Sequence, residues 1–451
     1  MPRSPATSSA DRTCEQLHRS RCLPSEASLH DLLTTGHMKV LKLTPFFHHP
    51  DAESWPREYD SVGGMQVQTW RQAVWLAEAG IHQHVMTIGF PGLPKLRQLH
   101  PLLWVERMMV PMPRIRSEFS GLVALTQSWA AATLGALFHR ARRQDFDVVH
   151  AHLDGQIPAL LVACLAPRLL GRPLIVTVHC SRLAVYTPTS WLDALQHRVA
   201  QWLERRTIAK AFAIMALTQR TAAVLAKDAQ RVAIVPDAVD TTQFAPPPLA
   251  AVKAFRERHG LRKKTVGFVG RIAKEKGWPH LIPLAKALRE EECELLIVGD
   301  GTQRDRLRRA IDEAGLQDCV TVTGFIPNHE VPLAMAACRL IVMPSMYEEF
   351  GGASIEALAI GVPVVAFAVG GLQEILRGVT PELLIPAEDT HTLITRAKEV
   401  LAGHHAKKVH PARLRAYVEG RYTPSAMCAR TLDLYQSAHG NSTKPARVGS
   451  R

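Results

Sequence analysis

The sequence predicts an α/β protein of two domains, each built on a parallel β-sheet covered by helices. The chain has 451 residues, which is long for a single hydrophobic core. Apolar strand-like runs alternate with helix-like stretches, the order that parallel sheets require. A proline-rich stretch, 235–248, interrupts this alternation. We therefore predict domains over 38–235 and 253–424, joined by a linker over 236–252.

The N-terminal extension lacks the composition of a folded element. Residues 1–37 are rich in Ser, Arg, Pro, Thr and His without sustained apolar periodicity, so we expect them to be disordered. Met38 stands immediately before the first strand-like run and is the expected functional start. The extension has no apolar core of a signal peptide, and no run is long enough to cross a membrane. Eight scattered cysteines without metal or redox spacing favour a cytoplasmic enzyme.

The first domain is expected to present polar residues where its strands end. The predicted strands are 40–46, 82–89, 147–152 and 173–179, and a helix opens after a glycine pair. Ligands of such sheets lie beyond the carboxyl ends of the strands. Each residue found there also has a structural explanation, because turns use Gly and Asp and a lone His at a strand end is often structural. The residues are Gly63, Gly64, His152, Asp154 and His179.

The most informative segment of the second domain reads as strand, loop, helix and strand. An apolar run ends at Pro344, and a polar loop containing Glu348 leads through a glycine pair into a helix that carries Glu356. A helix N-terminus that follows glycines offers unpaired N–H groups to an anion. The two carboxylates beside it suit the hydroxyl groups of a sugar nucleotide. An ordinary βαβ unit with surface glutamates is the alternative for any one of these residues.

This segment, 343–376, resembles the Glu-x7-Glu signature of retaining glycosyltransferases of family 4. Upstream, 267–277 (GFVGRIAKEKG) is similar to the Gly-Arg…Lys-Gly element of that family. The stretches 295–301 (LLIVGDG) and 322–327 (VTGFIP) match its next two elements. The resemblance implies the GT-B fold, in which two Rossmann-like domains face each other across a cleft.

The resemblance also implies how the second domain would bind a UDP-sugar. Arg271 and Lys276 correspond to the clamp on the diphosphate. Glu356 would bind the ribose, and Glu348 the hydroxyl groups of the donor sugar. The N–H groups of Gly352, Ala353 and Ser354 would assist the clamp, and Phe325 and Ile326 would line the pocket of the base.

In the first domain the resemblance implies three further roles. Gly63 and Gly64 form the glycine-rich loop near the donor phosphate and the acceptor. His179 corresponds to a histidine that contacts the donor sugar. Asp154 is a candidate for binding the acceptor. An equal alternative is that Asp154 stabilises a turn.

We predict a mechanism without a metal or another cofactor. Asp145 and Asp147 are similar to the metal-binding Asp-x-Asp of the other large glycosyltransferase fold, but Asp147 leads directly into a strand and no further ligands accompany it. No carboxylate need attack the sugar, because the departing diphosphate can take the acceptor proton on the same face. Arg271 and Lys276 would then stabilise the charge of the leaving group.

Three stretches indicate the acceptor by resemblance. Segments 61–70, 87–94 and 176–186 are similar to 2-deoxystreptamine glycosyltransferases of aminoglycoside biosynthesis, which use UDP-N-acetylglucosamine or UDP-glucose. A cationic aminocyclitol would favour carboxylates, and besides Asp154 we consider Asp60 and Glu58. Alternatives are a lipid or polysaccharide acceptor at a membrane, inositol phosphate, and a catalytically silent sugar-nucleotide-binding protein. The intact clamp and glutamates argue against the silent protein.

Two positions depart from the family pattern. The linker has Asp237 and Ala238 where Asn and Gly are usual, so the turn between the domains is expected to differ in shape. Glu349 stands where a small residue is usual.

The basic character of the chain has local explanations. The net charge is +13, and much of the excess lies near the C-terminus without the aromatic pattern of a nucleic-acid module, so we expect no nucleic-acid partner. Helix 191–210 is amphipathic and basic; we expect its apolar residues to pack on the sheet, with weak peripheral membrane contact as the alternative. By resemblance, helix 425–438 crosses back to the first domain, and 439–451 is expected to be a disordered tail.

Overall fold

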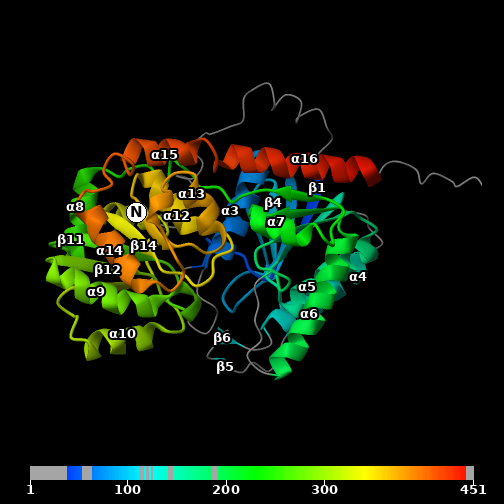
Figure 1. The fold of residues 1–451 in the computed structure, drawn as a ribbon. Helices are drawn as coiled ribbons and strands as arrows, with labels where there is room; N and C mark the ends of the chain where they lie inside the picture. Colours follow the sequence, from blue (N-terminus) through cyan, green and yellow to red (C-terminus); the bar gives the residue numbers. More distant parts are fainter. Residues whose placement is uncertain are drawn as a thin grey trace, which may run out of the picture.

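The computed structural model describes residues 38–52, 63–110, 116–117, 121–122, 125–140, 146–184 and 191–442. It contains two large β-sheets, each covered by helices, that lie in the two halves of the molecule (Figure 1). Residues 1–37, for which disorder was predicted, lie outside the described residues. The same holds for Glu58, Asp60 and Asp145.

The first sheet has eight strands in the order β10-β9-β8-β7-β1-β2-β4-β3. All neighbours pair in parallel except β3 and β4, which are antiparallel. The four predicted strands of this domain are confirmed as β1, β2, β7 and β8. The strands are β1 Lys39–Leu43, β2 His82–Ile88, β3 Leu96–His100, β4 Leu103–Met108, β7 Val148–Leu153, β8 Leu174–Val178, β9 Ala213–Ala216 and β10 Val232–Ile234; a separate antiparallel pair is β5 Arg116–Ser117 and β6 Gly121–Leu122.

Helices cover both faces of the first sheet. Strand residues alternate between the faces, so Leu41 and Leu43 contact the layer of α4, α5 and α6, whereas Val40 contacts α3 and the C-terminal helix α16. The predicted helix at the glycine pair is confirmed as α3, which begins at Gly64, the second glycine of the pair. The helices are α3 Gly64–Glu78, α4 Leu125–Arg140, α5 Ile157–Leu170, α6 Trp191–Lys210 and α7 Gln219–Leu225.

The second sheet has six parallel strands in the order β13-β12-β11-β14-β15-β16. This is the doubly wound arrangement in which the strand order reverses between the first and fourth strands. The elements are α8 Leu249–Arg258, β11 Lys264–Val269, η1 Lys274–Lys276, η2 Trp278–His280, α9 Leu281–Glu290, β12 Cys293–Val298, α10 Arg304–Glu313, β13 Val320–Gly324, α11 Val331–Ala336, β14 Leu340–Met343, α12 Gly352–Ile360, β15 Val364–Phe367, α13 Gly370–Arg377, η3 Pro381–Leu383, β16 Leu384–Ile385, α14 Thr390–Leu401 and α15 Pro411–Glu419.

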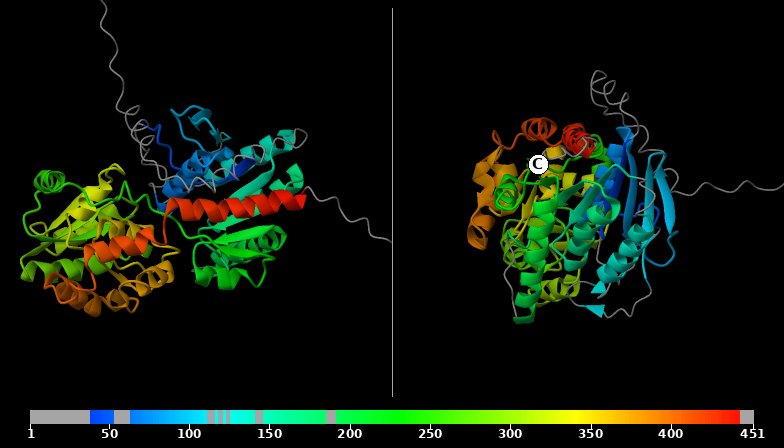
Figure 2. Two further views of the ribbon diagram at one scale, coloured as in Figure 1. Left: turned by 90° about the horizontal axis from the view of Figure 1, so that it is seen from above. Right: turned by 90° about the vertical axis from the view of Figure 1, so that its right-hand side faces the viewer.

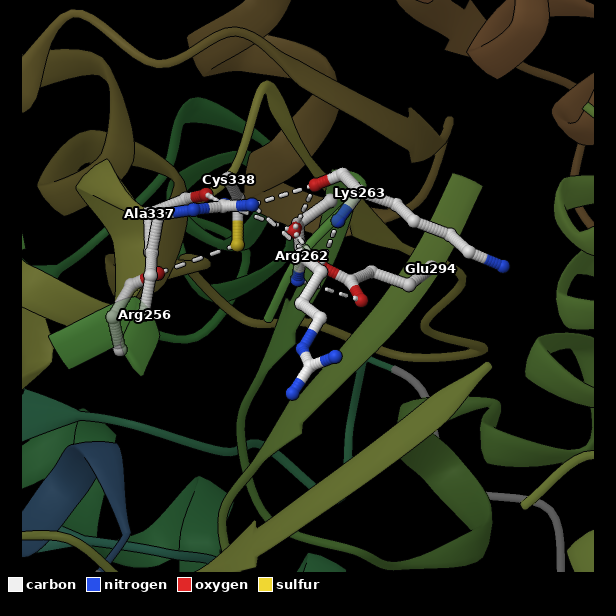
Figure 3. Close-up of polar contacts among 8 residues, drawn as sticks. Arg256, Arg262, Lys263, Glu294, Ala337 and Cys338 are labelled. Atoms are coloured by element: carbon white, nitrogen blue, oxygen red, sulfur yellow. Dashed lines mark hydrogen bonds and ion pairs between the residues drawn. The ribbon is translucent and has the colours of Figure 1, made fainter. Parts of the chain in front are cut away.

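A polar network joins α8 to the amino-terminal edge of the second sheet (Figure 3). Arg256 of α8 donates to the carbonyl oxygens of Ala337 and Lys263, both at 2.6 Å. Glu294 of β12 accepts from the Lys263 N–H at 3.2 Å and from the Thr265 hydroxyl at 2.7 Å. Because α8 begins at Leu249 and is anchored in this way, the last residues of the predicted linker pack with the second sheet.

The C-terminal helix α16, Pro424–Ser442, returns to the first half of the molecule, as Figure 2 shows. Its Tyr435 is fully buried, together with Leu432 and Ala438, against the face of the sheet that contains Val40. The helix ends four residues later than expected, so 439–442 are helical where we predicted a disordered tail. Ala438, the last residue of the predicted helix, is buried in the core, and His439 Nδ1 lies 3.7 Å from Asp147 Oδ1, so the helix still contacts the first half beyond its predicted end.

The orientation of α6 differs from the expectation for helix 191–210. Of the residues assigned to its packed face, only Leu203 is buried, whereas Leu195, Val199 and Trp202 are exposed. The buried side, which fits against α5, instead combines two large apolar residues with one small and two polar residues. These are Ala200, Leu203, Glu204, Thr207 and Ile208.

Candidate active site

The two halves meet through residues that follow strands at the carboxyl edges of the sheets. Glu349, in the loop after β14, accepts a hydrogen bond from the Thr221 hydroxyl of α7. Glu374 of α13 accepts from the backbone N–H groups of Gln219 and Arg220, each at 2.9 Å. These contacts bring the two carboxyl edges together, and the candidate residues of the sequence lie on both.

The candidate clamp lies at the point where the strand order of the second sheet reverses. Arg271 and Lys276 follow β11, and Glu348 follows β14, the neighbouring strand. Lys276 Nζ is 2.6 Å from Glu348 Oε1, and Arg271 Nη2 is 2.7 Å from Glu275 Oε1. The Met346 N–H donates to the Glu275 carbonyl at 2.8 Å, which joins the two loops. The structure therefore brings Lys276 and Glu348 into contact although 72 positions separate them.

Helix α12 presents its N-terminus at the same edge. Gly351, which precedes the helix, has φ of 95°, a left-handed conformation that favours glycine. Ser354 donates both its N–H and its hydroxyl to the Gly351 carbonyl, at 2.9 and 2.7 Å. Its N–H is therefore not available to a ligand, contrary to our assignment. In the described part of the chain, the N–H groups of Gly352 and Ala353 have no backbone acceptor.

A second glycine allows the loop that carries Glu348 to lie against α13. A Cβ atom at Gly370 would lie 1.6 Å from the Glu348 carbonyl oxygen, so no other residue fits without moving the backbone. The Gly371 N–H donates to the same oxygen at 3.3 Å. The Glu348 side chain also accepts from the Ser345 hydroxyl at 3.1 Å and is 10% exposed. Backbone and side chain of Glu348 are thus both held in place.

Glu356 of α12 forms an ion pair with the first half of the molecule. Arg71 of α3 places Nη1 2.9 Å from Glu356 Oε1, and their side chains are 7% and 18% exposed. Arg71 Nη2 is 3.5 Å from Gln243 Oε1, and its guanidinium lies 5.3 Å from the centre of the Phe244 ring. Sequence reasoning missed Arg71. The available signal was that it is the only charged residue between 64 and 77.

The glycine pair and α12 are connected through α3. Gly63 precedes α3 and donates its N–H to Gln66 Oε1 at 3.0 Å. One turn further, Gln68 approaches α12, since a Cβ atom added at Gly352 would lie 3.2 Å from Gln68 Nε2. The N-terminal turns of the two helices therefore lie close together. Gly63 and Gly64 lie in this region.

A buried group of imidazoles lies at the carboxyl edge of the first sheet. His152 Nδ1 is 2.9 Å from His179 Nε2, and His150 Nδ1 is 2.6 Å from the Tyr435 hydroxyl. Burial lowers the pKa of His179 to about 4, with a further contribution from the charge of Lys42. Burial also lowers the pKa values of His150 and His152 well below the ordinary value. All three imidazoles are therefore neutral near pH 7.

Lys42 of β1 belongs to this group and was missed by the sequence reasoning. Its side chain is fully buried, and Nζ donates to Gln72 Oε1 at 3.0 Å. Burial lowers its pKa to about 7. The strand around it is apolar, so a lysine at this position of a buried strand was the available signal.

The remaining candidates of the first half have structural partners. Asp154 Oδ1 accepts from the Gln156 N–H at 3.1 Å, the turn contact that was the alternative explanation. Burial raises the pKa of Asp154 to about 6. Asp147 Oδ2 accepts from the Lys39 N–H at 2.8 Å. Within the described residues, no three His, Cys, Asp or Glu side chains form a group that could hold a metal ion.

The two departures from the family pattern lie near each other. Glu349 Oε2 accepts from the Tyr347 hydroxyl at 2.9 Å, and burial raises the pKa of Glu349. Burial, and then the charge of Glu349, raise the pKa of Asp237 to about 8, and Asp237 Oδ2 is buried without a hydrogen-bond partner among the described residues. Neither carboxylate is paired with a cation within the part of the chain that the structure describes.

Phe325 and Ile326 are separated by the structure. Both follow β13, but Phe325 is 56% exposed whereas Ile326 is 9% exposed and packs in the core. Only the phenyl ring is therefore available to stack on a base.

Comparisons with known proteins agree with this architecture. The model of the family described as "Glycosyltransferase Family 4" matches residues 62–243, and that of "Glycosyl transferases group 1" matches 252–417. A 2-deoxystreptamine N-acetyl-D-glucosaminyltransferase of Streptomyces fradiae is 42% identical over 418 residues, 90% of this chain and 98% of that protein. A 2-deoxystreptamine glucosyltransferase of Streptomyces kanamyceticus is 45% identical over 346 residues, 75% of this chain and 89% of that protein.

Solved structures share the fold. Sucrose-phosphate synthase from Thermosynechococcus elongatus superposes with a TM-score of 0.75 at 23% identity and covers 90% of this chain and 100% of its own. The Anabaena protein HepE, solved with UDP-glucose, superposes with a TM-score of 0.67 at 21% identity over 89% and 100% of the two chains. The predicted fold of two Rossmann-like domains is confirmed.

Proposed function

The chain belongs to glycosyltransferase family 4, and from this membership we propose that it transfers N-acetylglucosamine or glucose from a UDP-sugar to a hydroxyl group of 2-deoxystreptamine. The observation that carries the proposal is the similarity to the two Streptomyces 2-deoxystreptamine transferases, above 40% in identity. The first of these alignments covers 90% of the chain and so includes the first half, which is expected to bind the acceptor. The two Streptomyces proteins act on the same acceptor and differ in the sugar that they transfer.

The donor diphosphate would bind at the reversal point of the second sheet. Lys276 has three N–H donors, so it can hold Glu348 and a phosphate oxygen together. Arg271 pairs with Glu275 at the surface, and such exposed pairs are worth about 0–1 kcal/mol, so a diphosphate can replace the carboxylate at little cost. The N–H groups of Gly352 and Ala353 add donors at the positive end of α12.

The carboxylates would orient the two sugars of the donor. Glu356 has one oxygen on Arg71 and would accept from the ribose hydroxyls with the other. Glu348, whose Oε1 is held by Lys276 and Ser345, would accept from hydroxyls of the transferred sugar. Phe325 would stack on the uracil ring.

The transfer would proceed on one face of the sugar. The bond between the anomeric carbon and the diphosphate oxygen breaks, the acceptor oxygen bonds to the same carbon, and the acceptor proton passes to the diphosphate. Arg271 and Lys276 stabilise the negative charge that develops on the leaving group. No metal takes part in this scheme.

The acceptor would lie at the carboxyl edge of the first sheet. His179, neutral at pH 7, can exchange hydrogen bonds with a sugar hydroxyl. Asp154, with a pKa of about 6, is mostly ionised near pH 7 and can pair with an ammonium group of the cyclitol. Both residues follow neighbouring strands, β8 and β7.

Product analysis by mass spectrometry tests the proposal. The purified protein is incubated with UDP-N-acetylglucosamine or UDP-glucose, each with 2-deoxystreptamine or with inositol phosphate. The expected product is 2-deoxystreptamine carrying one sugar, with release of UDP. Lys276→Ala serves as the inactive control. Sugar transfer to inositol phosphate and none to 2-deoxystreptamine would overturn the proposed acceptor. Release of UDP without a glycosylated product from either compound would overturn both acceptors.

A further inference from the structure

The outer side of α6 has an exposed apolar stripe. Trp191, Leu195, Val199 and Trp202 are 79%, 53%, 42% and 59% exposed. Their spacing of three and four residues places them on one side of the helix, opposite the residues that pack on α5. We call these four residues the α6 stripe. Large apolar side chains gathered in this way on a soluble surface mark an interaction site.

The neighbouring helices extend the apolar surface. Helices α4, α5 and α6 lie side by side over one face of the first sheet (Figures 1 and 2). Phe138 of α4 is 68% exposed and Leu161 of α5 is 37% exposed. The stripe is therefore one part of a broader outer layer with exposed apolar residues.

The exposed charges of this layer are positive. Arg198, Arg205, Arg206 and Lys210 of α6 are exposed, and Arg206 lies 5.4 Å from the centre of the Trp202 ring. The sequences of α4 and α5 contain no Asp or Glu. In α6, the one acidic side chain that the structure describes is Glu204, which is fully buried. Among the described residues, Asp228 Oδ2 lies 3.8 Å from Arg205 Nε.

The combination of exposed apolar side chains and exposed cations favours one kind of partner over another. A second copy of the chain would bring one basic stripe against another, with repulsion between the arginines. An anionic lipid surface receives both components, since Trp and Leu enter the boundary between headgroups and acyl chains while Arg and Lys contact the phosphates. We propose that the α6 stripe and its flanking cations dock the protein reversibly on an anionic lipid surface.

The proposal concerns where the protein resides and not what it glycosylates. Among the described residues, no helix is long and apolar enough to cross a membrane. Attachment by four cations and four side chains that lie in the interface is weak and sensitive to salt. The proposed transfer to a soluble aminocyclitol is compatible with it and does not depend on it.

Co-sedimentation with vesicles tests the proposal. Wild-type protein should pellet with phosphatidylglycerol-containing vesicles at low salt, and should stay in solution at high salt or with pure phosphatidylcholine. Each lost cation is expected to weaken binding about fivefold. The double variant Arg198→Glu and Arg206→Glu should therefore bind at least tenfold more weakly, and Trp202→Glu should also bind more weakly.

Matched substitutions elsewhere separate the stripe from general effects. Leu249→Glu in α8 changes a residue that is 87% exposed, and Arg308→Glu in α10 removes a surface cation; both variants should bind vesicles like wild type. UDP-sugar turnover without vesicles should be unchanged in all variants, which shows that they are folded. Absence of wild-type binding at low salt, or equal loss in the α8 and α10 variants, would overturn the proposal. So would a dimer that Trp202→Glu dissociates, because a second copy would then occupy the stripe.

Discussion

The basic residues at the carboxyl edges of the two sheets differ in their partners and in their exposure to solvent. At the second sheet, Lys276 and Arg271 each contact a carboxylate, and Arg271 is 40% exposed. At the first sheet, Lys42 and the imidazoles of His150 and His152 are buried and hydrogen-bond to neutral groups. The carboxylate partners of these accessible cations can be replaced by an anionic ligand. Buried groups that lose their charge can offer only neutral hydrogen bonds and shape.

This difference corresponds to the proposed division of labour. A diphosphate needs compensation of its charge, and the second edge provides cations whose present partners are side chains. A cyclitol with many hydroxyl groups needs donors and acceptors in fixed positions, which the buried network of the first edge provides, and Asp154 at the same edge would pair with an ammonium group. Four experiments would break or sharpen this comparison.

Removal of a clamp cation should have the largest effect. Lys276→Ala or Arg271→Ala should lower the turnover of the UDP-sugar by roughly two orders of magnitude or more, as loss of one oxyanion donor does. Turnover is measured by release of UDP. The control is Lys274→Ala, in the same loop and exposed, which should retain activity. Near wild-type turnover in either folded clamp variant would remove the second edge from the mechanism.

Arg71 tests whether the first half contributes to donor binding. Arg71→Ala removes a partly buried charge-assisted hydrogen bond worth about 1.5–3 kcal/mol. The KM for the UDP-sugar should therefore rise roughly tenfold, with a smaller change in kcat, because 1.4 kcal/mol corresponds to a factor of ten. Arg71→Lys should recover part of the affinity, and Arg97→Ala, at an exposed site, should have no effect. Unchanged affinity for UDP by calorimetry in Arg71→Ala would refute this role.

The buried imidazoles should make the protein sensitive to acid. The folded pKa of His179 is lowered from 6.5 to about 4, so the unfolded chain takes up its proton at higher pH than the folded chain. Stability is therefore fully present above pH 6.5 and is lost as the pH falls towards 4. Thermal midpoints across this range should fall less in His179→Gln than in wild type. The exposed His391→Gln should follow wild type; equal slopes in all three proteins would contradict the assignment.

Chelation should have the smallest effect. Arg271, Lys276 and the first-turn N–H groups of α12 supply the positive charge that a divalent cation would otherwise provide. After dialysis against chelator, activity with excess EDTA should equal that of untreated enzyme. A complete loss that magnesium restores would show that the residues near Asp147 were misinterpreted.

Sequence reasoning placed candidate residues where charged groups directly follow a strand or precede a helix. The loops after β11 and β14 could be recognised because apolar runs, glycines and charged residues occur in a fixed local order. Arg71 and Lys42 each stand out locally as a lone charge in an apolar helix or strand, but their partners lie 285 and 30 positions away, so the sequence does not show what they contact.

Two of the differences from the predictions concern helix surfaces. Amphipathic spacing in α6 showed correctly that two sides differ, but not which side packs, because the buried side is formed by Ala200, Glu204 and Thr207. The assignment of Ser354 failed because its N–H bonds to Gly351 within the first turn. Periodicity defines a stripe, and only the tertiary structure determines what covers it.

The return of α16 to the first sheet has a consequence for biosynthesis. His150 emerges from the ribosome 285 residues before Tyr435, the residue that covers it. Until synthesis is nearly complete, one face of the first sheet exposes Val40 and the buried polar groups to chaperones and proteases. A nonsense mutation shortly before Pro424 would leave the sequence of the first domain intact, yet we expect it to yield an aggregation-prone product. We therefore expect the first domain to reach its native fold only after α16, at the end of the chain, has been synthesised.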